Sequence, residues 1–329
     1  MGETMESYTG FAGVYDELMD ATPYEEWCQR IVDYIEKYGV SRPVHAKTDE
    51  GGAGKCQNGR EDHFKVSDGE KGAEKPPEAR DEKNDREGER EIAYDEQKTL
   101  REALESEKNL VLDLGCGTGT LTELMARRGY DMIGIDLSSE MLLLALEKKE
   151  ASRLDIMYFC QDMRELDMYS TIGTIYSVCD SINYLLEDED VIQCFKQVDM
   201  FLFPKGLFLF DFNTVYKYEQ IGDSVIAESR EDCSFIWDNY YDPDTHTNEY
   251  DLTIYQQKEG DLYRRFDETH VQRGYTLEEM KGFLKEAGLE FIEAVDGDTG
   301  GEVTEISERI FVAAREKDKD ISLSEEEYS

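Results

Sequence analysis

The chain has 329 residues, which is enough for about two domains of ordinary size. Its 76 acidic residues against 36 basic ones give a formal net charge of −40, and no apolar run approaches the length of a membrane-spanning helix. A chain this acidic is repelled by phosphate backbones and by anionic lipid. The composition therefore argues against a nucleic-acid partner and against a membrane partner.

The cysteines and histidines predict neither disulfides nor a metal site. The seven cysteines form no Cys-x-x-Cys pair, and the four histidines are scattered along the chain. An odd number of cysteines, without a signal peptide, indicates a cytoplasmic protein with reduced thiols.

The first 96 residues divide into a helical part and a charged part. In residues 1–40, Tyr15 and Trp27 belong to apolar stripes at helical spacing, so we predict N-terminal helices that pack on a core. Residues 41–96 are rich in Gly, Glu, Lys and Asp and contain few apolar residues, which predicts a disordered charged insertion. Residues 45–98 carry a net charge of only −5, so most of the acidity lies in the rest of the chain.

Strands and helices then alternate along residues 97–211, and this pattern resumes over residues 272–315. Short apolar runs are separated by helical segments of ten to fifteen residues, which is typical of βαβ units and a parallel sheet. The five strands expected in the first stretch are Leu110–Leu114, Met132–Asp136, Ile156–Phe159, Ile172–Cys179 and Gly206–Asp211.

Residues 212–271 break the alternation. Four strand-like runs separated by turn residues predict a small antiparallel β insert, which we expect to act as an acceptor-binding subdomain or lid. A helix opened by Thr276 and Glu279 and two final strands follow, and residues 316–329 are expected to form a disordered acidic tail. The fold class is α/β: a doubly wound, seven-stranded, mostly parallel sheet of Rossmann-like type with an inserted antiparallel β subdomain.

The glycine-rich turn after the first strand is the most informative motif. It reads Asp113-Leu-Gly115-Cys-Gly117-Thr-Gly119-Thr, and Asp136 ends the next strand, where a carboxylate can accept both hydroxyls of a ribose. The dinucleotide pattern G-x-G-x-x-G would need glycine at position 120 or 122, and both positions hold threonine. A nucleoside ligand without a pyrophosphate is therefore favoured over NAD.

These motifs together resemble those of class I S-adenosylmethionine-dependent methyltransferases, and the N-terminal segment and the insert resemble an uncharacterised bacterial branch of that family. The resemblance implies S-adenosylmethionine as the cofactor. By the family's usual roles, the glycine turn flanks the methionine part, Asp136 binds the ribose, Asp162 accepts from the adenine amine, and Asp113 holds the turn by accepting backbone N–H groups. The full set of cofactor-binding residues implied in this way is Tyr15, Asp113, Gly115, Cys116, Gly117, Gly119, Asp136, Leu137, Met141, Gln161, Asp162, Met163 and Cys179.

No catalytic residue follows from the motifs, and two candidates stay open. Asp180 can be a general base, a partner of the cofactor's ammonium group, or the cap of the segment that follows it. His270 can take part in catalysis or be a structural histidine of a strand.

The function predicted from these observations is methyl transfer to a small-molecule acceptor by in-line displacement. The alternatives are a protein methyltransferase and a catalytically silent module that binds the cofactor and acts through its insert. The acceptor, the methylated atom, the use of a general base and the oligomeric state are left open by the sequence.

Overall fold

The structure is a computed structural model that describes residues 15–16, 19, 22–45, 98–230 and 233–319. The chain divides into two compact units: residues 1–47 together with 107–329, and residues 48–106. Residues 98–106 of the second unit are helical. Among the described residues, no helix is both long enough and apolar enough to cross a membrane.

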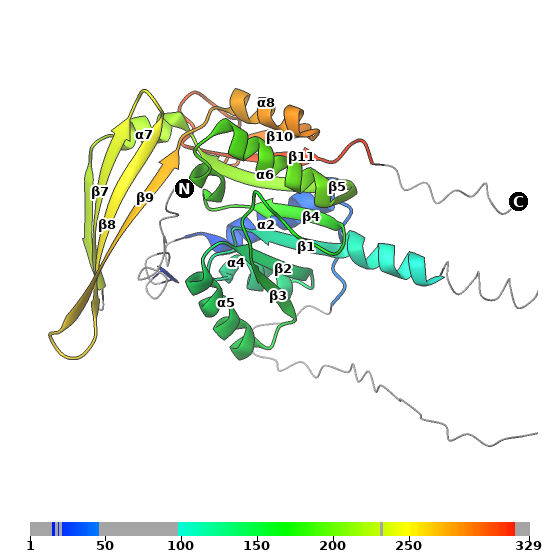
Figure 1. The fold of residues 1–329 in the computed structure, drawn as a ribbon, viewed down its shortest axis with the longest axis horizontal. Coiled ribbons are helices and arrows are strands. Elements are labelled where there is room, and N and C mark those ends of the chain that lie inside the picture. Colours follow the sequence, from blue (N-terminus) through cyan, green and yellow to red (C-terminus); the bar gives the residue numbers. More distant parts are fainter. Residues whose placement is uncertain (1–14, 17–18, 20–21, 46–97, 231–232, 320–329) are drawn as a thin grey trace, which may run out of the picture. The chain divides into compact units, whose positions relative to one another are not determined.

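The first unit contains a seven-stranded sheet with the strand order β10-β11-β5-β4-β1-β2-β3 (Figure 1). The neighbouring pairs among β1 to β5 are parallel, and β11 runs antiparallel to both β5 and β10. The order reverses between β1 and β4, and such a switch point opens a crevice at the carboxyl ends of the strands. The strands are β1 Leu110–Leu114, β2 Asp131–Asp136, β3 Ile156–Cys160, β4 Ile172–Ser177, β5 Leu202–Asn213, β10 Glu290–Asp296 and β11 Arg309–Arg315.

Helices cover both faces of this sheet, which is why its central strands read as continuous apolar runs. Every residue of β1 and β4 is buried. One face packs against α6 and α8, and the other packs against α2 and α4. The helical elements of the unit are α2 Tyr24–Tyr38, α4 Thr120–Arg127, α5 Ser139–Ser152, the 3-10 turn η1 Ser181–Tyr184, α6 Asp188–Phe201, α7 Val215–Ile221 and α8 Leu277–Ala287.

The segment between β5 and α8 forms a separate antiparallel sheet with the strand order β6-β7-β8-β9 (Figure 1, yellow-green to yellow). Its strands are β6 Val225–Ser229, β7 Cys233–Asp242, β8 Thr247–Gln257 and β9 Tyr263–Arg273. The predicted α/β class and the inserted β subdomain are both confirmed. The short helix α7 was not expected, and it begins where the Thr214 side chain accepts a hydrogen bond from the Lys217 backbone.

Two predicted boundaries need correction. Ser41 is buried, and its hydroxyl lies 2.9 Å from that of Thr174 in β4. The charged insertion therefore begins later than residue 41. The acidic tail begins later than residue 316, because Glu316 is buried and accepts hydrogen bonds from the backbone of Lys205 and Lys319. Residues 46–96 and 320–329 of the two predicted disordered segments lie outside the described residues.

Candidate active site

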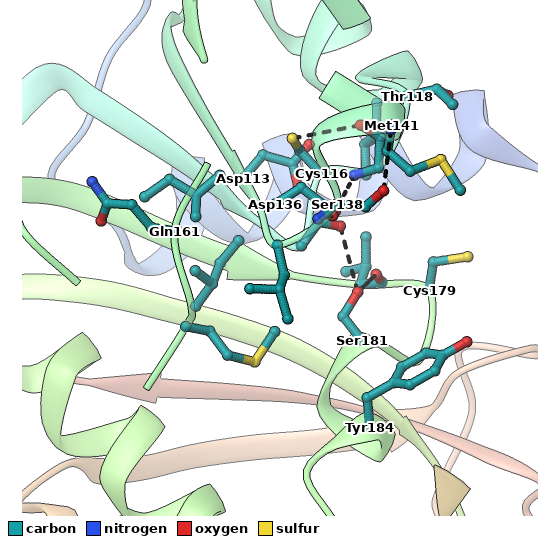
Figure 2. Close-up of a pocket in the computed structure, with 18 of the residues that line it drawn as sticks. Asp113, Cys116, Thr118, Asp136, Ser138, Met141, Gln161, Cys179, Ser181 and Tyr184 are labelled. Atoms are coloured by element: carbon teal, nitrogen blue, oxygen red, sulfur yellow. Dashed lines mark hydrogen bonds between the residues drawn. The ribbon is translucent and has the colours of Figure 1, made fainter. Parts of the chain in front are cut away.

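A cavity of about 490 Å³ lies where β1, β2 and β4 end. Figure 2 shows the β1 turn and the start of α5 on one side of it, and Cys179, Ser181 and Tyr184, which follow β4, on the other. The volume falls within the range of roughly 300–1,000 Å³ that is typical of small-molecule sites. The cavity therefore occupies the position that the glycine motif and the sheet order both indicate.

The glycine turn forms one wall of the cavity. Gly115, Gly117 and Gly119 all have positive φ, at 81°, 54° and 74°, a conformation that other residues rarely adopt. A Cβ on Gly115 would lie only 2.6 Å from the Ser181 hydroxyl oxygen, whereas a Cβ on Gly117 would meet no atom within 4 Å. The backbone at Gly117 is thus open for a ligand to approach.

Asp136 ends β2 beside this turn. Its two carboxylate oxygens accept the Gly117 backbone N–H at 2.7 Å and the Ser138 backbone N–H at 2.8 Å. Burial raises the pKa of this carboxyl above its usual value, and the two N–H bonds oppose the rise. Each carboxylate oxygen has a second lone pair, so Asp136 can also accept hydroxyl groups from a ligand.

Asp113 supports the turn in a different way from that expected. Its carboxylate accepts a hydrogen bond from the Thr122 hydroxyl at 2.6 Å, from the first turn of α4, instead of the predicted backbone N–H groups. The side chain is almost completely buried, and burial raises the pKa of Asp113 to about 7. Asp113 thus ties the strand before the turn to the helix after it.

Asp162 and Gln161 lie after β3 at the far end of the cavity. Both carboxylate oxygens of Asp162 accept from the Arg164 guanidinium, which also donates to Asp190 at 2.8 Å. These hydrogen bonds from Arg164 hold the pKa of Asp162 below its usual range, so Asp162 is a charged acceptor. Gln161 is braced by hydrogen bonds with the backbone of Asp167.

The turn after β4 is strained. Cys179 and Asp180 have φ of 66° and 53°, although neither is glycine. The Asp180 backbone N–H donates to Asp211, and the Asp180 carboxylate accepts from Gln272 at 2.6 Å and from Arg309 at 3.3 Å. Arg309 also donates to Asp211 at 3.0 Å, so these charged groups hold the turn in place.

The N-terminal segment reaches the same cavity. The Tyr15 hydroxyl lies 3.8 Å from Cys179 Sγ, and Asp16 accepts a hydrogen bond from the Thr118 hydroxyl at 2.7 Å. Lys148 of α5 pairs with Asp16 at 2.6 Å. Residues 15 and 16 are therefore anchored to both the glycine turn and the turn after β4.

Twelve of the thirteen residues predicted to bind the cofactor line the cavity. Gly119 does not, because it begins α4 and packs against Tyr158. The catalytic candidates Asp180 and His270 do not line it either, and His270 is a buried residue of β9. The lining residues that the sequence did not single out include Tyr24, Thr118, Arg164, Ser181 and Tyr184.

The residues present fit a nucleoside with an attached amino acid. Asp136 faces the cavity as a hydroxyl acceptor, Asp162 is a charged acceptor beside the apolar side chains of Leu137 and Met163, and Gly117 leaves its backbone open. The glycine turn lacks the third glycine of the dinucleotide pattern, because positions 120 and 122 both hold threonine. This donor set matches S-adenosylmethionine better than a dinucleotide.

Comparisons with known proteins agree with this geometry. A family model described as a methyltransferase domain matches residues 111–206. "Putative methyltransferase YqeM" of Bacillus subtilis (strain 168) is 37% identical over 224 residues, which cover 68% of this chain and 90% of that protein. A protein of Geobacillus sp. (strain WCH70) that is also named a methyltransferase is 36% identical over 220 residues, 67% of this chain and 89% of its own.

Among solved structures, a S-adenosylmethionine-dependent methyltransferase from Clostridium acetobutylicum ATCC 824 matches with a TM-score of 0.60 and 26% sequence identity. The match covers 69% of this chain and 98% of that one. Together with the two bacterial relatives and the geometry of the cavity, this match establishes that the chain belongs to the class I S-adenosylmethionine-dependent methyltransferases and uses S-adenosylmethionine as its cofactor.

Proposed function

We propose that the enzyme methylates a small-molecule acceptor by in-line displacement. The observation that carries the proposal is the cavity of about 490 Å³, whose lining includes the side chains of Tyr15, Tyr24, Tyr184 and Leu185. A site of this size, walled by aromatic side chains, suits a cofactor with one compact acceptor beside it.

The chain's own residues would hold the cofactor as follows. Asp136 binds the ribose hydroxyls, and Leu137 and Met163 flank the adenine, whose amine is accepted by Asp162. The open backbone of Gly117 faces the methionine part. S-adenosylmethionine supplies an activated methyl group on a sulfonium, so the protein contributes mainly proximity and alignment, worth up to about 7–11 kcal/mol.

Cys179 lines the cavity at the turn after β4, and its chemistry limits its role. Burial raises the pKa of the Cys179 thiol to about 12, so the sulfur stays neutral at physiological pH. A neutral thiol is a poor nucleophile. Cys179 is therefore part of the cavity wall rather than a methyl acceptor.

The net charge of the chain supports a small acceptor over a polynucleotide. With a formal charge of −40, the protein surface would repel a phosphate backbone. A protein acceptor is compatible with this charge and is separated from a small acceptor by the experiment below.

The test is methyl transfer from methyl-labelled S-adenosylmethionine in three separate incubations, with a bacterial metabolite ultrafiltrate, with bacterial protein and with bacterial RNA. We expect label in the small-molecule incubation alone. Label in protein or RNA would overturn the proposed acceptor class. Absence of label in all three, with S-adenosylmethionine binding intact by calorimetry, would favour the silent cofactor-binding module.

A further inference from the structure

Tyr184 connects the cavity to the four-stranded sheet. It ends η1 and lines the cavity, and its hydroxyl lies 3.1 Å from the Tyr250 hydroxyl and 3.2 Å from His270 Nδ1. Tyr250 on β8 and His270 on β9 are directly paired across the sheet, and their rings stack with centroids 5.1 Å apart. Two strands of the insert thus deliver polar groups to one point of the cavity wall.

Glu268 extends this chain of contacts away from the cavity. Glu268 and His270 lie two positions apart on β9, so their side chains share one face of the strand. Glu268 Oε2 is 3.4 Å from His270 Nε2, and both side chains are almost fully buried. A carboxylate opposite Nε2 favours the tautomer with the proton on Nε2, which leaves Nδ1 to accept from the Tyr184 hydroxyl.

Tyr250 sets the direction of the hydrogen bonds. Burial raises the pKa of Tyr250 well above its usual value, so Tyr250 keeps its proton. It can therefore donate to the Tyr184 oxygen while Tyr184 donates to His270. The Tyr250 hydroxyl thus donates to the Tyr184 oxygen, and the Tyr184 hydroxyl donates to His270 Nδ1. The Glu268 carboxylate lies beside Nε2 on the other side of the imidazole.

The charges that line the cavity restrict the acceptor. Asp136, Glu140 and Asp162 line it, and the one guanidinium among the described lining residues, that of Arg164, is bonded to two carboxylates. An anionic acceptor such as a carboxylate or thiolate would meet like charge there. An acceptor whose nucleophile carries a proton, an amine or a hydroxyl, suits this lining, and it must lose that proton for transfer to occur.

We propose that Tyr184, oriented by His270 and Glu268, removes the proton from the acceptor nucleophile, an inference that rests on the proposed small-molecule methyl transfer. The acceptor N–H or O–H proton passes to the Tyr184 oxygen while the Tyr184 proton passes to His270 Nδ1. The nucleophile's electron pair then forms the bond to the methyl carbon as the carbon–sulfur bond breaks, and its electrons remain on sulfur. Tyr184 is the catalytic residue, and His270 and Glu268 are positioning residues whose imidazolium and carboxylate hold the transferred proton.

The kinetic test uses the labelled product of the metabolite ultrafiltrate and compares Tyr184→Phe, His270→Gln and Glu268→Gln with the wild-type enzyme. We expect each of the first two variants to lower kcat by about 10²-fold while the Kd of S-adenosylmethionine stays within about twofold. Three titratable side chains from different elements face His270: those of Tyr184, Tyr250 and Glu268.

Tyr218→Phe is the matched control. Tyr218 is also a buried tyrosine that joins the core to β9, through a 2.7 Å hydrogen bond to Gln272, but it does not line the cavity. Loss of the Tyr218 hydroxyl should leave kcat within about threefold of the wild-type value. Equal losses in Tyr184→Phe and Tyr218→Phe would mean that both tyrosines only hold the sheets together, and would overturn the proposal. Chemical analysis of the labelled product as N-methyl or O-methyl identifies the acceptor atom, and a methyl ester or thioether product would also overturn it.

A second measurement does not depend on turnover. The ¹⁵N NMR spectrum of histidine-labelled protein, with and without S-adenosylhomocysteine, reports which imidazole nitrogen of His270 carries the proton, with His270→Gln assigning the resonance. We expect the proton on Nε2, and Tyr184→Phe should shift the Nδ1 resonance. A proton on Nδ1 would overturn the relay, because the imidazole could not accept from Tyr184. This outcome is separate from failure of the proposed function, which appears as absence of label in every incubation.

Discussion

The seven-stranded sheet is covered by helices on both faces, whereas the four-stranded sheet is exposed at its outer strand and buries polar side chains on its inner strands. In β1 and β4 the buried residues are mostly Val, Leu and Ile, with Asp113 as the charged exception. In the insert, by contrast, β6 is exposed along its whole length. The buried polar residues of the insert are Asn239, Asn248, Glu268, His270 and Gln272.

This difference separates two kinds of stabilisation. The core sheet is held by apolar burial on both faces, which is non-directional and tolerant of small shifts. The insert is joined through hydrogen bonds and charges, which are directional and costly to break once buried. None of the described residues of the insert lines the cavity, and the insert reaches it only through the contacts of Tyr250 and His270 with the Tyr184 hydroxyl.

The largest effect is expected at Arg309, whose guanidinium pairs with Asp211 of β5 and with Asp180, the carboxylate that also accepts a hydrogen bond from Gln272 of β9. Arg309→Ala leaves two carboxylates without their cation, and removal of one partner of a buried pair costs about 3–5 kcal/mol of unfolding free energy. Urea unfolding measures this cost. Arg265→Ala, which breaks the exposed pair with Asp267, is the control and should change the unfolding free energy far less. Similar losses of unfolding free energy in the two variants would contradict a stabilising role for the Arg309 ion pairs.

The next effect concerns the core side of the cavity. Asp136→Ala should weaken S-adenosylmethionine binding by about 10²-fold or more, because it removes the ribose acceptor and leaves the Gly117 and Ser138 N–H groups without their partner. Calorimetric titration measures the loss. Asp131→Ala, at the opposite end of β2, is the control and should leave the Kd within about twofold. Unchanged affinity in Asp136→Ala would contradict the ribose assignment.

A smaller, pH-dependent effect is expected from the one buried carboxylate of β1. Because burial raises the pKa of Asp113 from 3.8 to about 7, the folded state holds a proton that the unfolded state has lost at intermediate pH. The protein should therefore lose stability as the pH rises from about 4 to about 7, at up to about 1.4 kcal/mol per pH unit. Asp113→Asn keeps an acceptor for Thr122 and does not titrate.

The measurement for Asp113 is the difference in unfolding free energy between wild type and Asp113→Asn. Between about pH 5 and about pH 7, the unfolding free energy of the variant should rise by about 2 kcal/mol relative to that of the wild type. A difference that does not change with pH would show that Asp113 titrates normally in the fold.

The smallest effect is expected at the outer edge of the insert. Ile226 on β6 is half exposed, so Ile226→Thr should change the unfolding free energy by less than about 0.5 kcal/mol. Ile254→Thr, at a fully buried position of β8, is the matched comparison and should cost at least about 1 kcal/mol. Equal costs would mean that the outer strand is covered in solution.

Much of the core could be predicted from the sequence because its signals are local. A continuous apolar run such as Leu110–Leu114, followed by glycines that need positive φ, identifies β1 and its turn without any knowledge of distant residues. Asp136 follows from the same logic, as a carboxylate at the end of the next strand. The seven residues of α7 gave too short a pattern to be separated from the strands around them.

The contacts that Asp180 and Tyr184 make with β9 and β11 could not be predicted because the partner residues lie far apart in the chain. Arg309 and Asp180 are separated by 129 positions, and Tyr184 and His270 by 86, and neither pair leaves a spacing that a motif can record. Asp113 was expected to accept hydrogen bonds from backbone N–H groups, but it accepts one from the hydroxyl of Thr122 instead. Local patterns thus specify strands and turns, and tertiary packing decides which polar groups meet.

The left-handed turn at Cys179 and Asp180 narrows the choice of amino acids that these two positions can accept. A β-branched or bulky residue pays a steric penalty in that conformation, whereas glycine and asparagine adopt it at lower cost. Mutational libraries at position 179 should therefore return mostly small residues, and glycine there should enlarge the cavity beside Tyr15.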